Sequence, residues 1–172
     1  GEKFKFEAGW RSTLQRLDNV ADFNVFDDDL NAFFKVDSNS NRFLYDEDVH
    51  AVYTTFGGKV DKFTFSGGLR AEQAYTTSEL VEPTGEVFTN DYFKVYPSVF
   101  LGYSLSESST LQASYSRRVN RPRSRSLNPF VDRGDPLNLR TGNPFLLPEI
   151  INSFELNVQQ RFGMGTFTGG VY

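Results

Sequence analysis

Residues 93–105 read FKVYPSVFLGYSL and alternate between apolar and polar positions. Every second residue, beginning at Phe93, is apolar or proline, whereas Lys94 and Ser104 belong to the opposing row. Because successive side chains of a β-strand point to opposite faces, a period of two predicts a strand with one apolar face and one polar face. Pro97 is unusual in such a strand, since its nitrogen cannot donate a ladder hydrogen bond.

The same alternation recurs along the rest of the chain, and no segment shows convincing helical periodicity. The expected strands cover about residues 2–16, 42–56, 63–76, 93–105, 111–120, 150–162 and 166–172. An aromatic content of 16%, with 18 Phe and 8 Tyr, also favours β structure. The sequence therefore predicts an all-β chain of about seven antiparallel, up-and-down strands.

The connections between these strands alternate in length. Long ones are expected at 18–41, 77–91 and 122–148, and short ones at 57–62, 106–109 and 163–165. In an up-and-down sheet, this order gathers the long loops at one end, as in outer-membrane barrels with short periplasmic turns and longer extracellular loops. A soluble sheet also alternates when one of its faces meets water. A soluble β-sheet interaction or adhesion module is therefore the alternative.

The amino-acid composition argues against several classes of function. The 172 residues suit one domain, and a net charge of −4 does not indicate a nucleic-acid partner. The absence of cysteine excludes disulfides and thiolate metal sites, and no run of eighteen apolar residues predicts a transmembrane helix. The sequence contains no glycine-rich phosphate-binding loop, no glycine motif of dinucleotide-binding folds and no set of residues with the spacing of a zinc site. We therefore expect neither an enzyme nor a cofactor or metal site.

Two acidic clusters and one histidine are the remaining candidates for chemistry. The clusters occupy residues 27–29 and 46–48, and neither has the glycine and terminal glutamate of a calcium loop. His50 is the single histidine, and no serine or acid is spaced to form a catalytic triad with it. We interpret the clusters as solvated acidic surface and His50 as structural.

The longest connection lies within residues 117–149, RRVNRPRSRSLNPFVDRGDPLNLRTGNPFLLPE. It contains five of the chain's seven prolines and seven arginines. A long Pro- and Asn-punctuated loop between two strands is a common location of functional residues. Its candidate ligand-binding residues, which could attract carboxylates or phosphates, are Arg117, Arg118, Arg121, Arg123 and Arg125. The alternative is that these arginines pair with acidic groups on neighbouring strands.

This region also carries a family resemblance. The matching pieces are YSRRVNRP at 115–122, LNPF at 127–130, DPLNLRTGNPFLLPE at 135–149, PSVFLGYSLSESSTLQASYS at 97–116, FLYDEDVHAVYTTF at 43–56 and FTFSGGLRAE at 63–72. Together they resemble TonB-dependent outer-membrane receptors, of the outer membrane β-barrel family branch. The order and spacing of RP, LNPF, GNP and PE are specific, and the likeness covers most of residues 42–162.

The resemblance implies that residues 1–172 are part of a large transmembrane β-barrel in the outer membrane of a Gram-negative cell. Outer-membrane transporters of this kind have about 22 strands, so seven strands imply a partial barrel without its plug. The implied function is uptake of a nutrient such as a metal chelate, a glycan or a peptide. The implied partners are the remainder of the barrel, the plug domain, TonB through a part outside this chain, and outer-membrane lipid.

Overall fold

The computed structural model describes residues 3–133, 135 and 137–172. Within them, seven antiparallel strands form one sheet in the order β1-β4-β5-β6-β7-β8-β9. The strands are β1 (Lys3–Ala21), β4 (Asn41–Val60), β5 (Phe63–Glu82), β6 (Glu86–Ser104), β7 (Ser109–Asn120), β8 (Glu149–Phe162) and β9 (Gly165–Val171). Each strand pairs with its neighbour along the chain, so the predicted all-β, up-and-down architecture is confirmed.

The remaining elements are short and lie in two of the connections. The hairpin of β2 (Asn24–Asp27) and β3 (Ala32–Lys35), followed by the 3₁₀ turn η1 (Asp37–Asn39), connects β1 to β4. The single-turn helix α1 (Ser124–Leu127) lies between β7 and β8. In the part of the chain that the structure describes, no helix has the length and hydropathy needed to cross a membrane.

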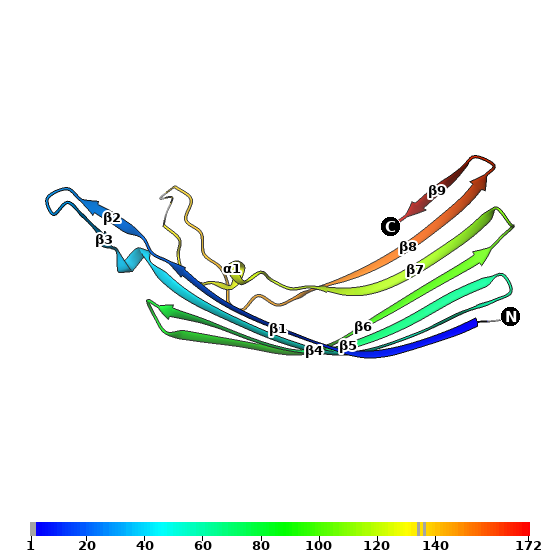
Figure 1. The fold of residues 1–172 in the computed structure, drawn as a ribbon, viewed down its shortest axis with the longest axis horizontal. Coiled ribbons are helices and arrows are strands. Elements are labelled where there is room, and N and C mark those ends of the chain that lie inside the picture. The colour runs from blue at the N-terminus through cyan, green and yellow to red at the C-terminus, as the bar shows by residue number, and fades with distance from the viewer. Residues whose placement is uncertain (1–2, 134, 136) are drawn as a thin grey trace.

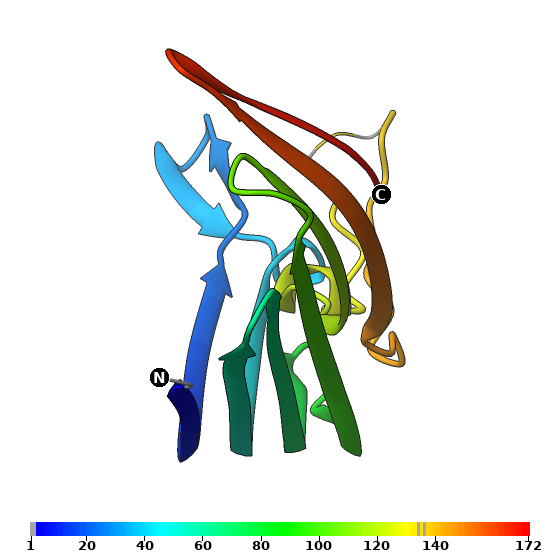
Figure 2. The ribbon, with the colours of Figure 1, turned by 90° about the vertical axis from the view of Figure 1, so that its right-hand side faces the viewer.

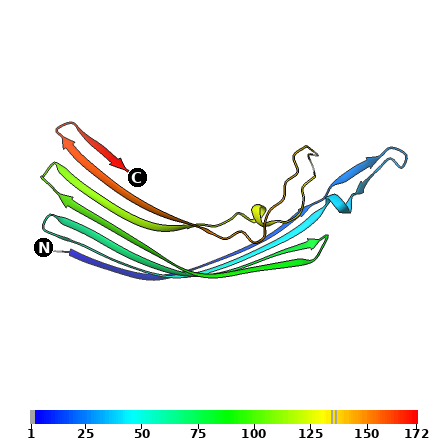
Figure 3. The same ribbon diagram turned by 180° about the vertical axis from the view of Figure 1, so that it is seen from behind.

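The sheet is a curved trough with two different ends (Figure 1). The β4–β5, β6–β7 and β8–β9 connections lie at one end, the turn end, and the β2–β3 hairpin extends from the other, the loop end. Seen from the turn end, the strands follow an arc from β1 to β9, as a segment of barrel wall would (Figure 2). Residues 121–148 are here called the insert, and their described part (121–133, 135 and 137–148) rises from the concave side near the loop end (Figure 3).

The strands are longer than the alternation predicted. β1 continues to Ala21, and the loop expected at 77–91 is wrong, because β5 runs to Glu82 and β6 begins at Glu86. Only residues 83–85 turn, where Gly85 has a positive φ of 68° and its N–H donates to the Leu80 carbonyl at 2.8 Å. Backbone pairing keeps this polar segment in the sheet although it lacks an apolar row.

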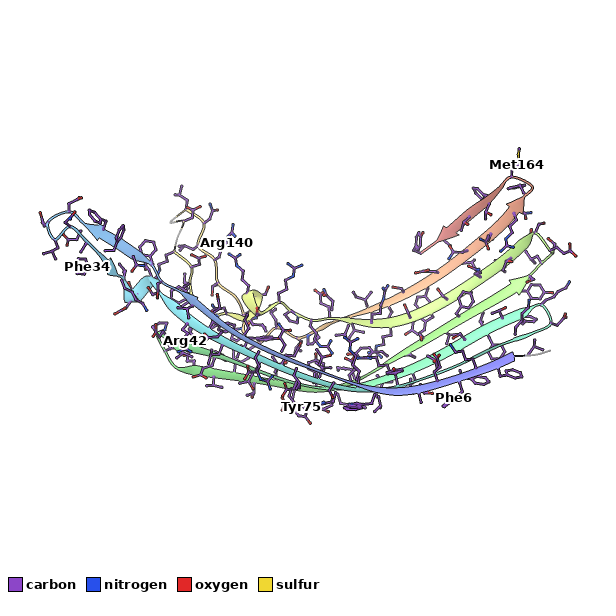
Figure 4. The ribbon with its side chains drawn as sticks, in the orientation of Figure 1. Phe6, Phe34, Arg42, Tyr75, Arg140 and Met164 are labelled. Atoms are coloured by element: carbon purple, nitrogen blue, oxygen red, sulfur yellow. The ribbon has the colours of Figure 1, made fainter. Side chains whose placement is uncertain are left out.

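The convex face carries the apolar rows. Cross-strand partners share a face, and the register pairs Phe6 with Phe56 and Leu69 with Pro97. Figure 4 shows Phe6 and Tyr75 on this convex side. Fourteen large apolar side chains on this face are exposed: Phe4, Phe6, Trp10, Val52, Phe56, Phe63, Leu69, Phe93, Val99, Leu101, Phe154, Leu156, Val158 and Phe162. No described layer covers them, as expected for a surface that contacts lipid.

This apolar band ends in a belt of aromatic and polar side chains. The indole of Trp10 donates to the Ser12 hydroxyl at 2.9 Å, and that hydroxyl lies 2.8 Å from Nδ1 of His50. The His50 ring meets Tyr75 edge-on, with centroids 6.4 Å apart. Amphipathic rings of this kind occupy the membrane–water boundary of outer-membrane barrels. His50 therefore has a structural place at the edge of the band.

Beyond the belt, the convex face is ionic. Arg16 pairs with Asp48, and Arg42 pairs with Asp18 at 2.8 Å, all on the outward row of β1 and β4. A strand of 20 residues such as β4 spans about 66 Å, whereas a transmembrane strand needs only about 9–11 residues. The ionic loop-end half of the sheet is therefore longer than a bilayer would require and suits an aqueous environment.

Candidate functional site

The insert is shaped by Asn-Pro turns. The tripeptide Asn-Pro-Phe occurs twice, at 128–130 and at 143–145. In each copy the Asn carboxamide oxygen accepts the backbone N–H of the Phe two residues later, at 3.0 Å in both cases. Proline fixes φ and the Asn side chain closes the turn, so each tripeptide bends the chain without help from a neighbouring strand.

Gly142 lets two segments of the insert touch. Its N–H donates to the Asn128 carbonyl at 2.8 Å, and the next N–H, of Asn143, donates to the Ser126 carbonyl at 2.8 Å. A Cβ at position 142 would lie 2.6 Å from both carbonyl oxygens. The glycine of the GNP motif is therefore required by close backbone approach.

Apolar contacts hold the insert against the concave face. Leu127 is buried with Phe43, Tyr45 and Leu80 of β4 and β5, and Phe130 packs against the same cluster. This cluster is the hydrophobic core of the described chain, and it lies at the loop end. The LNPF motif supplies two of its members, which explains why a loop sequence carries large apolar residues.

Arg121 forms the polar anchor of the insert. Its guanidinium pairs with Glu72, donates to the Tyr92 hydroxyl at 2.7 Å and lies 3.5 Å from Glu47. Glu72 is 4% exposed and also pairs with Arg70. A carboxylate this buried is tolerated because two guanidinium groups neutralise it. Arg121 was a predicted ligand contact, and the structure places it in a network that holds the insert to β4, β5 and β6.

Burial beside this anchor changes the ionisation of Tyr45. Its ring belongs to the buried cluster at the loop end, outside the apolar band. Burial raises the pKa of the Tyr45 phenol well above its usual value, and the neighbouring Glu47 carboxylate adds to the rise. The phenol therefore stays neutral where exposed tyrosines ionise.

The other predicted arginines are dispersed. Arg118 is exposed and donates to the Ser153 hydroxyl of β8 at 3.1 Å, whereas Arg117 is half-buried with its Nε enclosed. Arg123 precedes α1 and Arg125 lies in its last turn, and both are exposed. The five arginines therefore do not form one positive patch.

An open groove of about 1230 Å³ separates the insert from the extended ends of β1 and β4. Its lining includes Arg125 and Arg140. The sequence did not select Arg140, which Figure 4 shows on the insert. Arg140 lies fifteen residues further along the chain, so its proximity to the groove depends on the folded path of the insert. The sequence did contain one signal, because Arg125 and Arg140 belong to the same stretch rich in Asn and Pro.

The acidic clusters serve structural contacts. The Asp27 carboxylate accepts the N–H groups of Asp29 and Leu30, which closes the β2–β3 turn. In the second cluster, Asp48 pairs with Arg16, and Glu47 faces Arg121. Among the described residues, no group of three or more His, Cys, Asp or Glu could hold a metal ion.

The chain matches a known protein family. The sequence model of the family described as "Outer membrane protein beta-barrel family" matches residues 1–172, which is the whole chain. No curated protein matches the chain significantly.

Proposed function

The chain belongs to the outer membrane protein β-barrel family, and on that premise we propose that it forms wall and outer loops of a TonB-dependent receptor that takes up a nutrient. Family membership places the chain in the outer membrane. The receptor activity is our inference. It goes beyond the family because a barrel in this membrane can also act as a passive pore or as an adhesin.

One observation carries the proposal: the insert is folded against the concave face and borders a large groove at the loop end. A structural barrel needs no such internal segment. A receptor that captures a scarce solute needs a shaped, water-accessible site inside its outer mouth. The signature that resembles TonB-dependent receptors supplies most of this segment, since its LNPF and GNP motifs form the turns described above.

The remaining partners follow from the same proposal. We propose that further barrel strands complete the wall, and the unpaired outer edges of the described sheet at β1 and β9 support this. A plug inside the barrel and TonB across the periplasm would couple uptake to the energised inner membrane. The loop end would face the outside, as longer loops do in this class.

Uptake measurements test the proposal. A strain lacking the gene is compared with its parent for uptake of labelled metal chelates, oligosaccharides and peptides, each with and without a protonophore. We expect at least one solute class to enter the parent strain at low concentration, to depend on the gene, and to stop when the proton gradient is dissipated. Deletion of tonB should give the same loss.

Two outcomes would contradict the receptor. Gene-dependent uptake that continues with the protonophore would indicate a passive pore. Unchanged uptake of every solute, combined with lost attachment to surfaces or other cells, would indicate the adhesion module that strand alternation alone left open.

A further inference from the structure

We propose that the groove between the insert and the β1–β4 wall binds an organic anion, with Arg125 and Arg140 holding its carboxylate or phosphate group. The proposal rests on the receptor function above and deepens it, because it assigns a ligand class and two residues to the site. In this proposal Arg121 does not contact the ligand, because it pairs with Glu72.

The first argument is that these two guanidinium groups are uncommitted. Arg16, Arg42, Arg70 and Arg121 all pair with carboxylates. Within residues 3–133, 135 and 137–172, neither Arg125 nor Arg140 has such an ion pair, and both are exposed in the groove lining. Guanidinium binds planar carboxylate and phosphate groups bidentately, so two free ones in one groove favour an anion.

The second argument is that the backbone is held in place at both Arg125 and Arg140. Arg125 lies in the helical turn α1, next to buried Leu127. The Arg140 backbone is held by two hydrogen bonds: the Asp132 N–H donates to the Arg140 carbonyl at 2.7 Å, and the Arg140 N–H donates to the Asp132 carbonyl at 3.3 Å. A site on a fixed backbone loses less entropy on binding.

The remaining lining selects an organic anion over a bare inorganic ion. Asp22, the acidic group on the wall, is already neutralised by Lys35 at 2.8 Å. The insert contributes a second carboxylate, Asp132, whose backbone pairs with that of Arg140. The other lining side chains include carboxamides, hydroxyls and apolar groups, among them Asn19, Asn143, Ser124, Thr141, Phe23 and Phe130. Amides suit hydroxyl or carbonyl groups of a ligand, and the rings suit its carbon skeleton. The groove, at about 1230 Å³, has room for both.

The test uses the protein purified from outer membranes in detergent, and three titrants in calorimetry: citrate, glucose 6-phosphate and uncharged glucose. We expect at least one anion to bind and glucose to bind far more weakly. Arg125→Gln and Arg140→Gln should each weaken anion binding about tenfold, and the double variant should weaken it more. Arg133→Gln is the matched control, because Arg133 is exposed in the same insert but does not line the groove.

Several results would overturn the site. These are no binding of either anion, equal loss in Arg133→Gln, or unchanged binding in the double variant. Lipopolysaccharide is a fourth titrant, and binding of it alone would reassign the arginines to the membrane surface. Unshifted gel mobility of the folded barrel in each variant confirms that folding is intact. Because calorimetry needs no energy coupling, anion binding without protonophore-sensitive uptake would refute the receptor and retain the site.

Discussion

The two halves of this sheet share their strands but not their surroundings. In the turn-end half, the convex face is apolar and exposed, and the concave face carries polar side chains. In the loop-end half, the convex face carries ion pairs such as Arg42–Asp18, and the concave face is covered by the insert. The same backbone ladder thus serves a lipid environment at one end and an aqueous one at the other.

The difference shows what stabilises each half. The turn-end half depends on lipid, because its exposed apolar row has no described protein layer to cover it. The loop-end half has a core of its own, built from Phe43, Leu80 and Leu127. Pairing between β6 and β7 ends at Ser98, next to Pro97, and β6 continues beyond that point without a β7 partner.

The largest effect should come from a charge in the lipid band. Val99 and Val87 both lie on the outward row of β6 and are exposed, at 44% and 56%. We expect Val99→Arg to lower the free energy of unfolding by about 2–4 kcal/mol, since the arginine would face the bilayer core. Val87→Arg should change it by less than about 0.5 kcal/mol. Urea unfolding in lipid vesicles measures both, and equal effects would refute the division into halves.

A smaller effect should follow from removing the anchor of the insert. Arg121→Met leaves buried Glu72 with Arg70 alone, and we expect a loss of about 2 kcal/mol. The loss should be local, so hydrogen exchange should accelerate in residues 121–148 and not in β1. Arg118→Met, which removes an exposed side chain, is the control. Faster exchange throughout the sheet would show that the halves unfold as one.

Glycine replacements give a closer comparison of the two halves. In Gly142→Ala, the new methyl group would lie 2.6 Å from two carbonyl oxygens, so we expect a cost of about 1–2 kcal/mol. Gly67→Ala, on the lipid-facing row of β5, meets nothing within 4 Å and should be close to neutral. Protease cleavage of the insert in detergent measures the first effect, and an uncleaved Gly142→Ala insert would contradict it.

The smallest effect concerns alkaline pH. The raised pKa of Tyr45 means that the folded state holds its phenolic proton more tightly than the unfolded state, whose value is about 10. Its contribution to stability is therefore complete below about pH 10 and is lost as pH rises through the folded value. The difference between the absorbance titrations of wild type and Tyr45→Phe should show one tyrosine that ionises after the exposed tyrosines. If Tyr45 ionised at the same pH as the exposed tyrosines, the burial of its phenol would be refuted.

Alternation predicted the strands well wherever one face is apolar. It failed at residues 77–91. There the outward face of the strands meets water, and the inward face lies under the insert. Polar residues such as Thr77 and Asn90 therefore occur in these strands, and no period-two pattern is visible. Strand order was predictable from the short connections. The length of each strand beyond the membrane was not, since hydrogen-bond pairing extends it.

For the candidate site, the sequence selected the segment that contains the two proposed groove arginines, and it selected Arg125 but not Arg140. It grouped Arg117, Arg118, Arg121, Arg123 and Arg125 by proximity along the chain. The fold separates them, because an irregular segment sends neighbouring side chains in different directions. Arg121 turns toward Glu72, whereas Arg125 faces the groove with Arg140.

By itself, then, the sequence determined the strand class, the up-and-down order, the family and the segment that differs from the wall. These follow from local rules: a period of two, turn residues and motif spacing. The tertiary structure decided that this segment folds against the concave face. It also decided which arginines pair with carboxylates and which have no such pair among the described residues. Those outcomes depend on contacts between residues far apart in the chain, such as Arg121 with Glu72 and Leu127 with Phe43, and no local pattern encodes them.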